Sequence, residues 1–270
     1  MRHLFVVLAL LTVTASAQSP VAPANPPQPV AAPAAARGVP LPELTCPDLA
    51  AALRTVSAND VRNRDWPAMN RYREANVTAK NVQVVFMGDS ITDSWQQPRF
   101  GGFFPGKPYV DRGISGQTTP QMLLRFRSDV VNLKPKAVVI LAGTNDIAGN
   151  TGPLTDAEIE GNLASMSELA HAHQIKVVFS SITPISSYHV QPNGNPQTFQ
   201  RPMARIHAIN DWMKKYAADH GDVYLDYFSA MTDDKGLLKA ELSADDLHPT
   251  TAGYAVMGPL AEAAIQKALK

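Results

Sequence analysis

Short apolar runs alternate with stretches of helical periodicity along most of this chain, and this alternation limits the fold more than any other feature. The runs predict five strands, over residues 82–87, 108–113, 137–142, 175–180 and 223–226. Between them, apolar residues recur at helical spacing, as from Ile159 to Ala170. Strands that alternate with helices predict a parallel sheet covered on both faces. The expected fold class is α/β, a three-layer α/β/α sandwich with a flavodoxin-like parallel sheet of about five strands.

Local signals place several helix ends. Thr119, followed by Pro120, is expected to cap one helix, since proline suits the first helical position. Thr155 and Glu158 have the spacing of a capping box at the start of another. A last helix is expected over residues 251–270, with a kink or break at Gly258-Pro259.

The chain divides into three parts by composition. Residues 1–17 have the pattern of a secretory signal peptide, with Ala15-Ser16-Ala17 as the cleavage site, so the protein is expected to be secreted or periplasmic. Residues 18–44 hold eight of the 22 prolines and predict a disordered linker. Residues 45–270 are long enough for one domain with a full core. Cys46 is the only cysteine, so no internal disulfide is possible.

Charge excludes some partners. Lys+Arg and Asp+Glu both number 24, so no basic excess favours nucleic acid. The apolar run of the signal peptide is too short to cross a bilayer, and no basic amphipathic run favours a membrane surface. We therefore expect no nucleic-acid partner and no stable membrane insertion.

A small hydroxyl residue stands where the first strand ends. Gly88 permits a sharp turn, and Asp89 and Ser90 follow it directly. Open α/β sheets bind ligands at the carboxyl ends of their strands, and a following helix would direct N–H groups toward that position. A simpler interpretation is that Asp89 and Ser90 only cap that helix, since both are good N-caps.

Three more features decide between these interpretations. Gly113 and Asn145 also follow apolar runs, so parallel strands would bring them to the same sheet edge as Ser90. Asp245 lies three residues before His248, a spacing that lets its carboxylate reach the imidazole in a helical turn. Each feature alone is more often structural, as a cap, a turn glycine or a loop residue. Their combination favours a catalytic site.

The residue types suit acyl transfer through a serine nucleophile. An imidazole can take the proton of a serine hydroxyl, and an adjacent carboxylate fixes the tautomer of the imidazole. The N–H groups of Ser90 and Gly113 and the side-chain amide of Asn145 would supply three donors to an oxyanion. Ser90, Asp245 and His248 are thus the predicted catalytic residues, and Ser90, Gly113 and Asn145 the predicted oxyanion hole.

The same residues resemble the motifs of a known family, the SGNH hydrolases or GDSL esterases/lipases. Gly88-Asp89-Ser90-Ile91, Gly113, residues 143–146 and Asp245-x-x-His248 match its four blocks in order, between Val82 and Leu269. Residues 113–119 and 133–139 look similar to the catalytic subunits of intracellular platelet-activating-factor acetylhydrolase, and secreted acetylesterases share much of the pattern. The resemblance implies the roles given above to Ser90, His248, Asp245, Gly113 and Asn145. It also implies that no metal or organic cofactor is needed.

The expected function is therefore an exported serine esterase that hydrolyses short-chain, above all acetyl, O-esters of a small molecule or glycan through an acyl-enzyme. The polar loop at residues 183–199 offers little apolar surface to a fatty chain. One alternative is a lysophospholipase or thioesterase with the same site. The other is a non-catalytic flavodoxin-like binding module, which would not need Asp245 or His248. His171 and His173 point in different directions on a helix and are poor metal ligands.

Overall fold

The computed structural model describes residues 50–51, 53–54, 56, 64–189, 191 and 194–270. The predicted signal peptide, the linker of residues 18–44 and Cys46 lie outside these residues. Within the described part of the chain, no helix is both long and apolar enough to cross a membrane.

Five parallel strands form one sheet, as predicted. The strands are β1 (Val84–Gly88), β2 (Tyr109–Gly113), β3 (Ala137–Leu141), β4 (Lys176–Ser180) and β5 (Val223–Leu225). Their order across the sheet is β2-β1-β3-β4-β5, and every neighbouring pair is parallel. The chain therefore moves to one side of β1 for β2 and to the other side for the remaining strands. The point between β1 and β3, where the order reverses, is the usual ligand position in such sheets.

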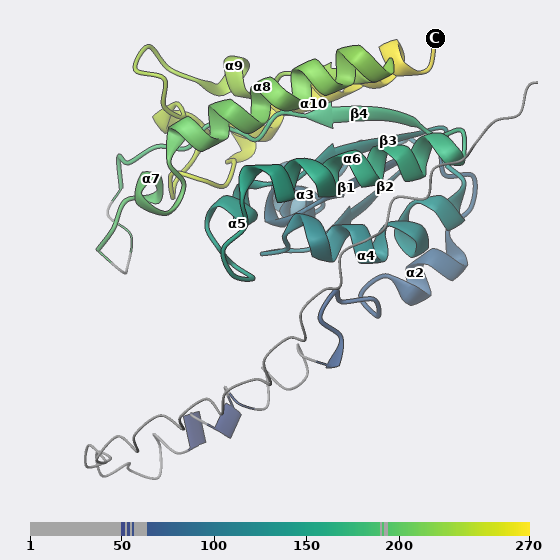
Figure 1. The fold of residues 1–270 in the computed structure, drawn as a ribbon, viewed down its shortest axis with the longest axis horizontal. Helices are drawn as coiled ribbons and strands as arrows, with labels where there is room; N and C mark the ends of the chain where they lie inside the picture. Colours follow the sequence, from purple (N-terminus) through teal and green to yellow (C-terminus); the bar gives the residue numbers. More distant parts are fainter. Residues whose placement is uncertain (1–49, 52, 55, 57–63, 190, 192–193) are drawn as a thin grey trace, which may run out of the picture. The chain divides into compact units, whose positions relative to one another are not determined.

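Helices cover both faces of the sheet (Figure 1). The longer ones are α4 (Thr119–Asp129), α6 (Asp156–Ala172), α8 (Met203–His220) and α10 (Thr251–Ala268). The shorter ones are α2 (Arg73–Thr78), α3 (Ser90–Trp95), α5 (Thr144–Ile147), α7 (Gln197–Gln200) and α9 (Tyr227–Met231). Three single 3₁₀ turns are η1 (Pro98–Phe100), η2 (Val131–Leu133) and η3 (Ala240–Leu242).

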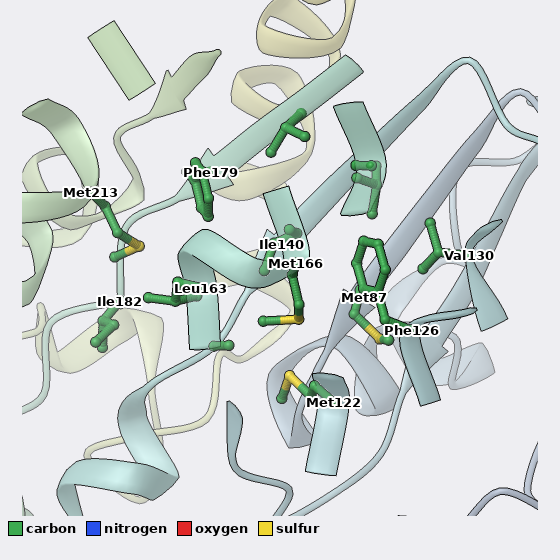
Figure 2. Close-up of a cluster of buried hydrophobic side chains, with 14 of the residues drawn as sticks. Met87, Met122, Phe126, Val130, Ile140, Leu163, Met166, Phe179, Ile182 and Met213 are labelled. Carbon is green, nitrogen blue, oxygen red and sulfur yellow. The ribbon is translucent and has the colours of Figure 1, made fainter. Parts of the chain in front are cut away.

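Alternate strand residues face two separate apolar layers, because successive side chains of a strand point to opposite faces. One layer joins the sheet to α4, α6 and α8, and its buried side chains include Met87, Ile140, Phe179, Met122 and Leu163 (Figure 2). The other layer joins the sheet to α3, α9 and α10. Trp95, one turn after Ser90, belongs to this second layer and is 5% exposed. The strands are thus buried on both faces, as their continuous apolar sequences indicate.

The helix ends follow the local signals with two differences. Thr155 and Glu158 form the predicted capping box of α6. The cap of α4 is Thr118, one residue earlier than predicted, and its capping-box partner is Gln121. The expected break at Gly258-Pro259 does not occur, because α10 continues through Pro259. A proline inside a helix costs about 3 kcal/mol, and the buried face of α10, which includes Tyr254, Met257 and Ala261, offsets that cost.

Candidate active site

Ser90 is the first residue of α3, directly after the turn that ends β1. Asp89 is the N-cap of α3, and its Oδ1 accepts a hydrogen bond from the Ile91 N–H at 2.9 Å. At Gly88 a Cβ atom would lie 2.1 Å from Thr92 Oγ1, so this tight turn requires glycine. The predicted capping role of Asp89 is therefore confirmed, and the cap leaves the Ser90 hydroxyl free to bond elsewhere.

The structure brings Ser90, His248 and Asp245 together. Ser90 Oγ lies 2.9 Å from His248 Nε2, although the two residues are 158 positions apart. His248 Nδ1 lies 2.7 Å from Asp245 Oδ2. The other carboxylate oxygen of Asp245 accepts the backbone N–H groups of Leu247 and His248, at 3.1 and 2.7 Å. Asp245 thus holds both the imidazole and the turn that carries it.

The ionisation of Asp245 and the tautomer of His248 follow from the groups around them. Partial burial raises the pKa of Asp245, but hydrogen bonds from the His248 side chain and backbone outweigh it and hold the pKa well below its usual range. Because Asp245 is ionised, His248 donates from Nδ1 and leaves Nε2 to accept the Ser90 hydroxyl proton. The geometry is that of a serine activated by a general base.

Asp89 is a second carboxyl close to the nucleophile, and it is fully buried. Burial raises its pKa to about 6, although the hydrogen bond from the Ile91 N–H and the positive charge of Arg201 act in the opposite direction. Its Oδ2 has no hydrogen-bond partner among the described residues. This side chain caps the turn that carries Ser90.

The structure does not make the Gly113 N–H available as an oxyanion donor. This N–H donates to Asp111 Oδ1 at 2.7 Å, in a buried position at the end of β2. A Cβ atom at Gly113 would lie 2.2 Å from the Asp93 backbone nitrogen, so the glycine permits α3 to pack closely on β2. The prediction for Gly113 is corrected accordingly, because a side chain two residues earlier already satisfies this donor.

Gly116, three residues further on, has the free N–H and the positive φ that Gly113 lacks. It lies in the loop after β2 with a φ of 80°, a conformation that favours glycine. Its carbonyl accepts Asn150 Nδ2 at 3.1 Å, whereas its N–H has no hydrogen bond to any described residue. The Ser90 N–H is likewise without an acceptor in the described part of the chain. Two backbone donors, one at Ser90 and one in the loop after β2, are therefore without an acceptor among the described residues.

Asn145 lies on α5, immediately after β3, and its amide is held on both sides. Asn145 Nδ2 donates to the Gln117 carbonyl at 3.1 Å, which leaves its second hydrogen free to bond. Arg201 Nη2 lies 3.5 Å from Asn145 Oδ1, so the guanidinium orients the amide. The next residue, Asp146, accepts the N–H of Thr119 at 2.9 Å and links this loop to α4.

Arg201 was not found by sequence reasoning. It is 6% exposed, and it also donates to Thr144 Oγ1 at 3.2 Å and to Gln197 Oε1 at 2.7 Å. Burial lowers its pKa, while the negative charges of Asp89 and Asp245 act to raise it. A single arginine between α7 and α8 in a polar segment has no local pattern that marks it, and only the folded chain brings it to Asn145.

The polar loop before α7 supports residues 245–248, the turn that carries Asp245 and His248. Asp246 accepts hydrogen bonds from the Ser186 hydroxyl at 2.5 Å and the His189 N–H at 2.7 Å. Gln191 Nε2 donates to the Asp245 carbonyl at 3.1 Å. The side chains of Ser186 and Gln191 and the backbone N–H of His189 are therefore engaged in holding residues 245–248, which reduces what the loop can offer to a substrate.

The buried pair of Asp111 and Gly113 leads to a prediction about stability. Burial raises the pKa of Asp111 to about 7, although the Gly113 N–H acts to lower it, and an unfolded aspartate titrates near 3.9. The folded protein therefore holds a proton between these values that the unfolded chain releases. The stabilising effect of this proton on Asp111 is complete below about pH 4 and is lost as the pH rises through about 7.

We expect Asp111→Asn to remove this pH dependence. Relative to the variant, the wild-type protein should lose at least about 1.4 kcal/mol of unfolding free energy between pH 4 and pH 8, the value of one pKa unit. Denaturant unfolding of both proteins at several pH values measures the difference, and other titrating groups cancel in the comparison. A constant difference across this range would contradict the prediction.

No cluster of three or more metal-ligating side chains is present among the described residues. His171, for example, forms a hydrogen bond with Asp222, with Nε2 2.6 Å from Oδ1.

Comparisons with known proteins agree with the motifs. Residues 86–256 match the model of the GDSL-like Lipase/Acylhydrolase family. The chain is 26% identical over 218 residues to the platelet-activating factor acetylhydrolase IB subunit alpha2 of Rattus norvegicus, covering 78% of this chain and 88% of the relative. It is 25% identical over 206 residues to an acetylxylan esterase of Geobacillus stearothermophilus, covering 65% and 90%. Among solved structures, a putative acylhydrolase from Bacteroides fragilis has 39% sequence identity and a TM-score of 0.69, covering 76% of this chain and 99% of that one.

Proposed function

The chain belongs to the GDSL-like lipase/acylhydrolase family, and from this premise we propose that it is an exported serine esterase that removes short acyl groups, above all acetyl, from oxygen. The observation that best supports the proposal is the hydrogen-bonded series from Ser90 Oγ through His248 to Asp245, at 2.9 and 2.7 Å. This series lies at the switch point of the sheet, where such folds bind their ligands.

The reaction proceeds in two steps. Ser90 Oγ attacks the ester carbonyl carbon while His248 Nε2 takes the hydroxyl proton, and that proton then passes to the leaving alcohol oxygen as its bond to carbon breaks. A water molecule attacks the acyl-Ser90 ester in the second step, with His248 again as base. The products are a carboxylic acid and the free serine.

Charge on the carbonyl oxygen is stabilised by the N–H groups of Ser90 and Gly116 and by the free hydrogen of Asn145 Nδ2. These groups are held by the β1–α3 turn, the loop after β2 and α5, so little reorganisation is needed when the charge develops. Gly116 takes the place first predicted for Gly113, whose N–H is occupied.

Removal of the Asn145 amide should act on the transition state. We expect Asn145→Ala to lower kcat by about 10²–10³-fold with little change in KM, as for loss of one oxyanion donor. Because the amide also bonds to the Gln117 carbonyl and Arg201, the melting temperature should fall by a few degrees, about the effect of 1 kcal/mol. Steady-state kinetics separates the two parameters, and a raised KM at constant kcat would make Asn145 a substrate-binding residue only.

The preference for short acyl groups rests on the walls near the site. A cavity of about 280 Å³ beside His248 is lined by Arg99, Phe100, Thr250 and Thr251 as well as Asp245. A true lipase gains about 0.8 kcal/mol per buried CH₂ along a continuous apolar groove. Here Phe100, Ala244 and Pro249 supply apolar surface, but the charged groups of Arg99 and Asp245 and the hydroxyls of Thr250 and Thr251 interrupt it. Two relatives are named for acetyl groups, an acetylhydrolase and an acetylxylan esterase.

A series of esters of graded chain length tests the proposal. We expect kcat/KM to be highest for acetyl to butyryl esters and to fall for longer acyl groups. Efficiency that rises to octanoyl or beyond would favour the lysophospholipase alternative, and preferential cleavage of acyl thioesters would favour a thioesterase. Absence of hydrolysis of every ester would contradict the esterase itself and leave a binding module.

Export rests on the sequence of residues 1–17, which lie outside the described part of the chain. We expect the mature protein to begin at Gln18 and to be found outside the cytoplasm. N-terminal sequencing of the protein from an exporting host checks this, and an intact Met1 on the accumulated protein would contradict it.

A further inference from the structure

A pocket of about 490 Å³ lies beside the proposed oxyanion donors. Four segments line it: the turn before α2, the loop after β2, the first turn of α4 and the loop after α5. Gly116 and Gln117 belong both to this pocket and to the site, since the Gln117 carbonyl accepts Asn145 Nδ2. The remaining wall includes Asp65, Trp66 and Asn150. The alcohol part of a substrate can therefore occupy this pocket while the ester carbonyl oxygen of the same molecule bonds to the Gly116 N–H.

The side chain of Trp66 is 40% exposed at this pocket, although the turn that carries it is held firmly. Gln121 Nε2 donates to the Trp66 carbonyl at 2.7 Å, and Gln117 Nε2 donates to the Pro67 carbonyl at 2.8 Å. Gln117 is itself fixed, because its Oε1 accepts the fully buried Arg125 Nε at 2.5 Å. A large aromatic surface is thus kept in contact with solvent on a rigid support.

The neighbours of Trp66 are polar. Asn150 uses its Nδ2 on the Gly116 carbonyl, and its Oδ1 has no hydrogen bond to the described residues. Thr151 and Ser115 contribute hydroxyl groups to the same wall. An aromatic face beside hydroxyl and amide groups suits a ligand with one apolar face and a rim of hydroxyls.

We propose that this pocket binds a glycosyl unit of the alcohol half of the substrate, with the pyranose ring stacked on Trp66 and its hydroxyls bonded to Asn150 and its polar neighbours. The proposal rests on the proposed esterase function and names its substrate class. The apolar C–H face of a sugar ring matches an indole in size, and the ring hydroxyls match the polar wall.

Two other occupants fit less well. A fatty chain would need apolar walls, whereas most residues here are polar. A phosphocholine group would need cations for its phosphate and several aromatic rings for its ammonium, but the described lining residues include no Lys or Arg and only one aromatic ring. The Asp65 carboxylate is already used, because its two oxygens accept the N–H groups of Met69 and Asn70 at 2.7 and 2.9 Å.

The test compares an acetylated xylo-oligosaccharide with ethyl acetate, which has no glycosyl group. In Trp66→Ala, the ratio of kcat/KM for the sugar ester to that for ethyl acetate should fall about tenfold, mainly through KM, and Trp66→Phe should restore most of it. Leu124→Ala, which removes an exposed apolar side chain from the outer surface of α4, should leave both values unchanged. An unchanged ratio in Trp66→Ala, or loss that is not recovered by phenylalanine, would overturn the proposal.

A binding measurement separates this proposal from the esterase function. Calorimetric titration of the wild-type protein with unacetylated xylotetraose should give binding that Trp66→Ala weakens about tenfold, whether or not esters are hydrolysed. If esters are cleaved but Trp66→Ala binds xylotetraose as the wild type does, the glycosyl subsite is wrong and the esterase stands. Binding of phosphocholine that is tighter than that of xylotetraose and lost in Trp66→Ala would also overturn it.

Discussion

Ser90→Ala is expected to lower kcat by about 10⁶-fold, as for loss of the nucleophile in other serine hydrolases, while the fold is retained. The only described hydrogen bond of Ser90 Oγ is to His248 Nε2, so the hydroxyl contributes little to packing. Hydrolysis of an aryl acetate measures the loss, and thermal unfolding checks that the variant is folded.

A covalent probe tests the same residue without reliance on the rate. An organophosphonate ester should add to Ser90, and mass spectrometry of proteolytic peptides should locate the adduct there. Ser94→Ala, which removes a second hydroxyl one turn later on α3, serves as the matched control and should be labelled as the wild type is. Labelling that persists in Ser90→Ala would exclude Ser90 as the nucleophile.

Asp245→Asn should lower kcat by about 10⁴-fold through the tautomer of His248. The asparagine Nδ2–H would face the imidazole where a carboxylate oxygen now accepts, so Nδ1 would become the acceptor and Nε2 would carry the proton. Nε2 could then no longer take the proton of Ser90. The asparagine Oδ1 can still accept the Leu247 and His248 N–H groups, so the turn should keep its shape.

The pH profile of the wild type and a matched control variant both test the role of Asp245. Because the pKa of Asp245 is held well below its usual range, the carboxylate stays ionised in mildly acidic solution, and its stabilising effect is lost only as the pH falls through that depressed value. In acidic solution kcat/KM of the wild type should fall because a protonated His248 cannot take the Ser90 proton, and not because Asp245 loses its charge. Asp219→Asn, at an exposed position of α8, is the matched control, and a loss in Asp219→Asn equal to that in Asp245→Asn would contradict the assignment.

Much of the fold follows from local patterns. Val84–Gly88 and Ala137–Leu141 are buried on both faces and are continuous in apolar sequence, which is what a central parallel strand requires. The capping box of Thr155 and Glu158 depends on two side chains three residues apart, so the sequence alone predicts it. The break expected at Pro259 did not occur, because burial of α10 outweighs a local preference.

The site shows where such patterns stop being sufficient. Gly113 and Gly116 both follow the same strand, and nothing in their spacing tells which N–H is free. The Asp111 carboxylate decides the matter by accepting the Gly113 N–H, a contact between residues only two apart that depends on the burial of both. Arg201 reaches Asn145 across 56 positions, and Gln121 fixes Trp66 across 55, so neither contact leaves a mark in the local sequence.

Local sequence patterns were therefore sufficient to predict the α/β class, the order of the strands along the chain and the residue types of an acyl-transfer site. Periodicity, capping and strand-end position are local properties, and these features depend on them. The tertiary structure decided which donors remain free, which charges are buried beside Ser90 and which polar side chains of residues 183–199 hold the catalytic turn. Most of those features depend on contacts between distant segments, and the bond between Asp111 and Gly113 depends on the burial that the fold imposes on both. A buried polar group bonds to whichever partner the packing brings within reach.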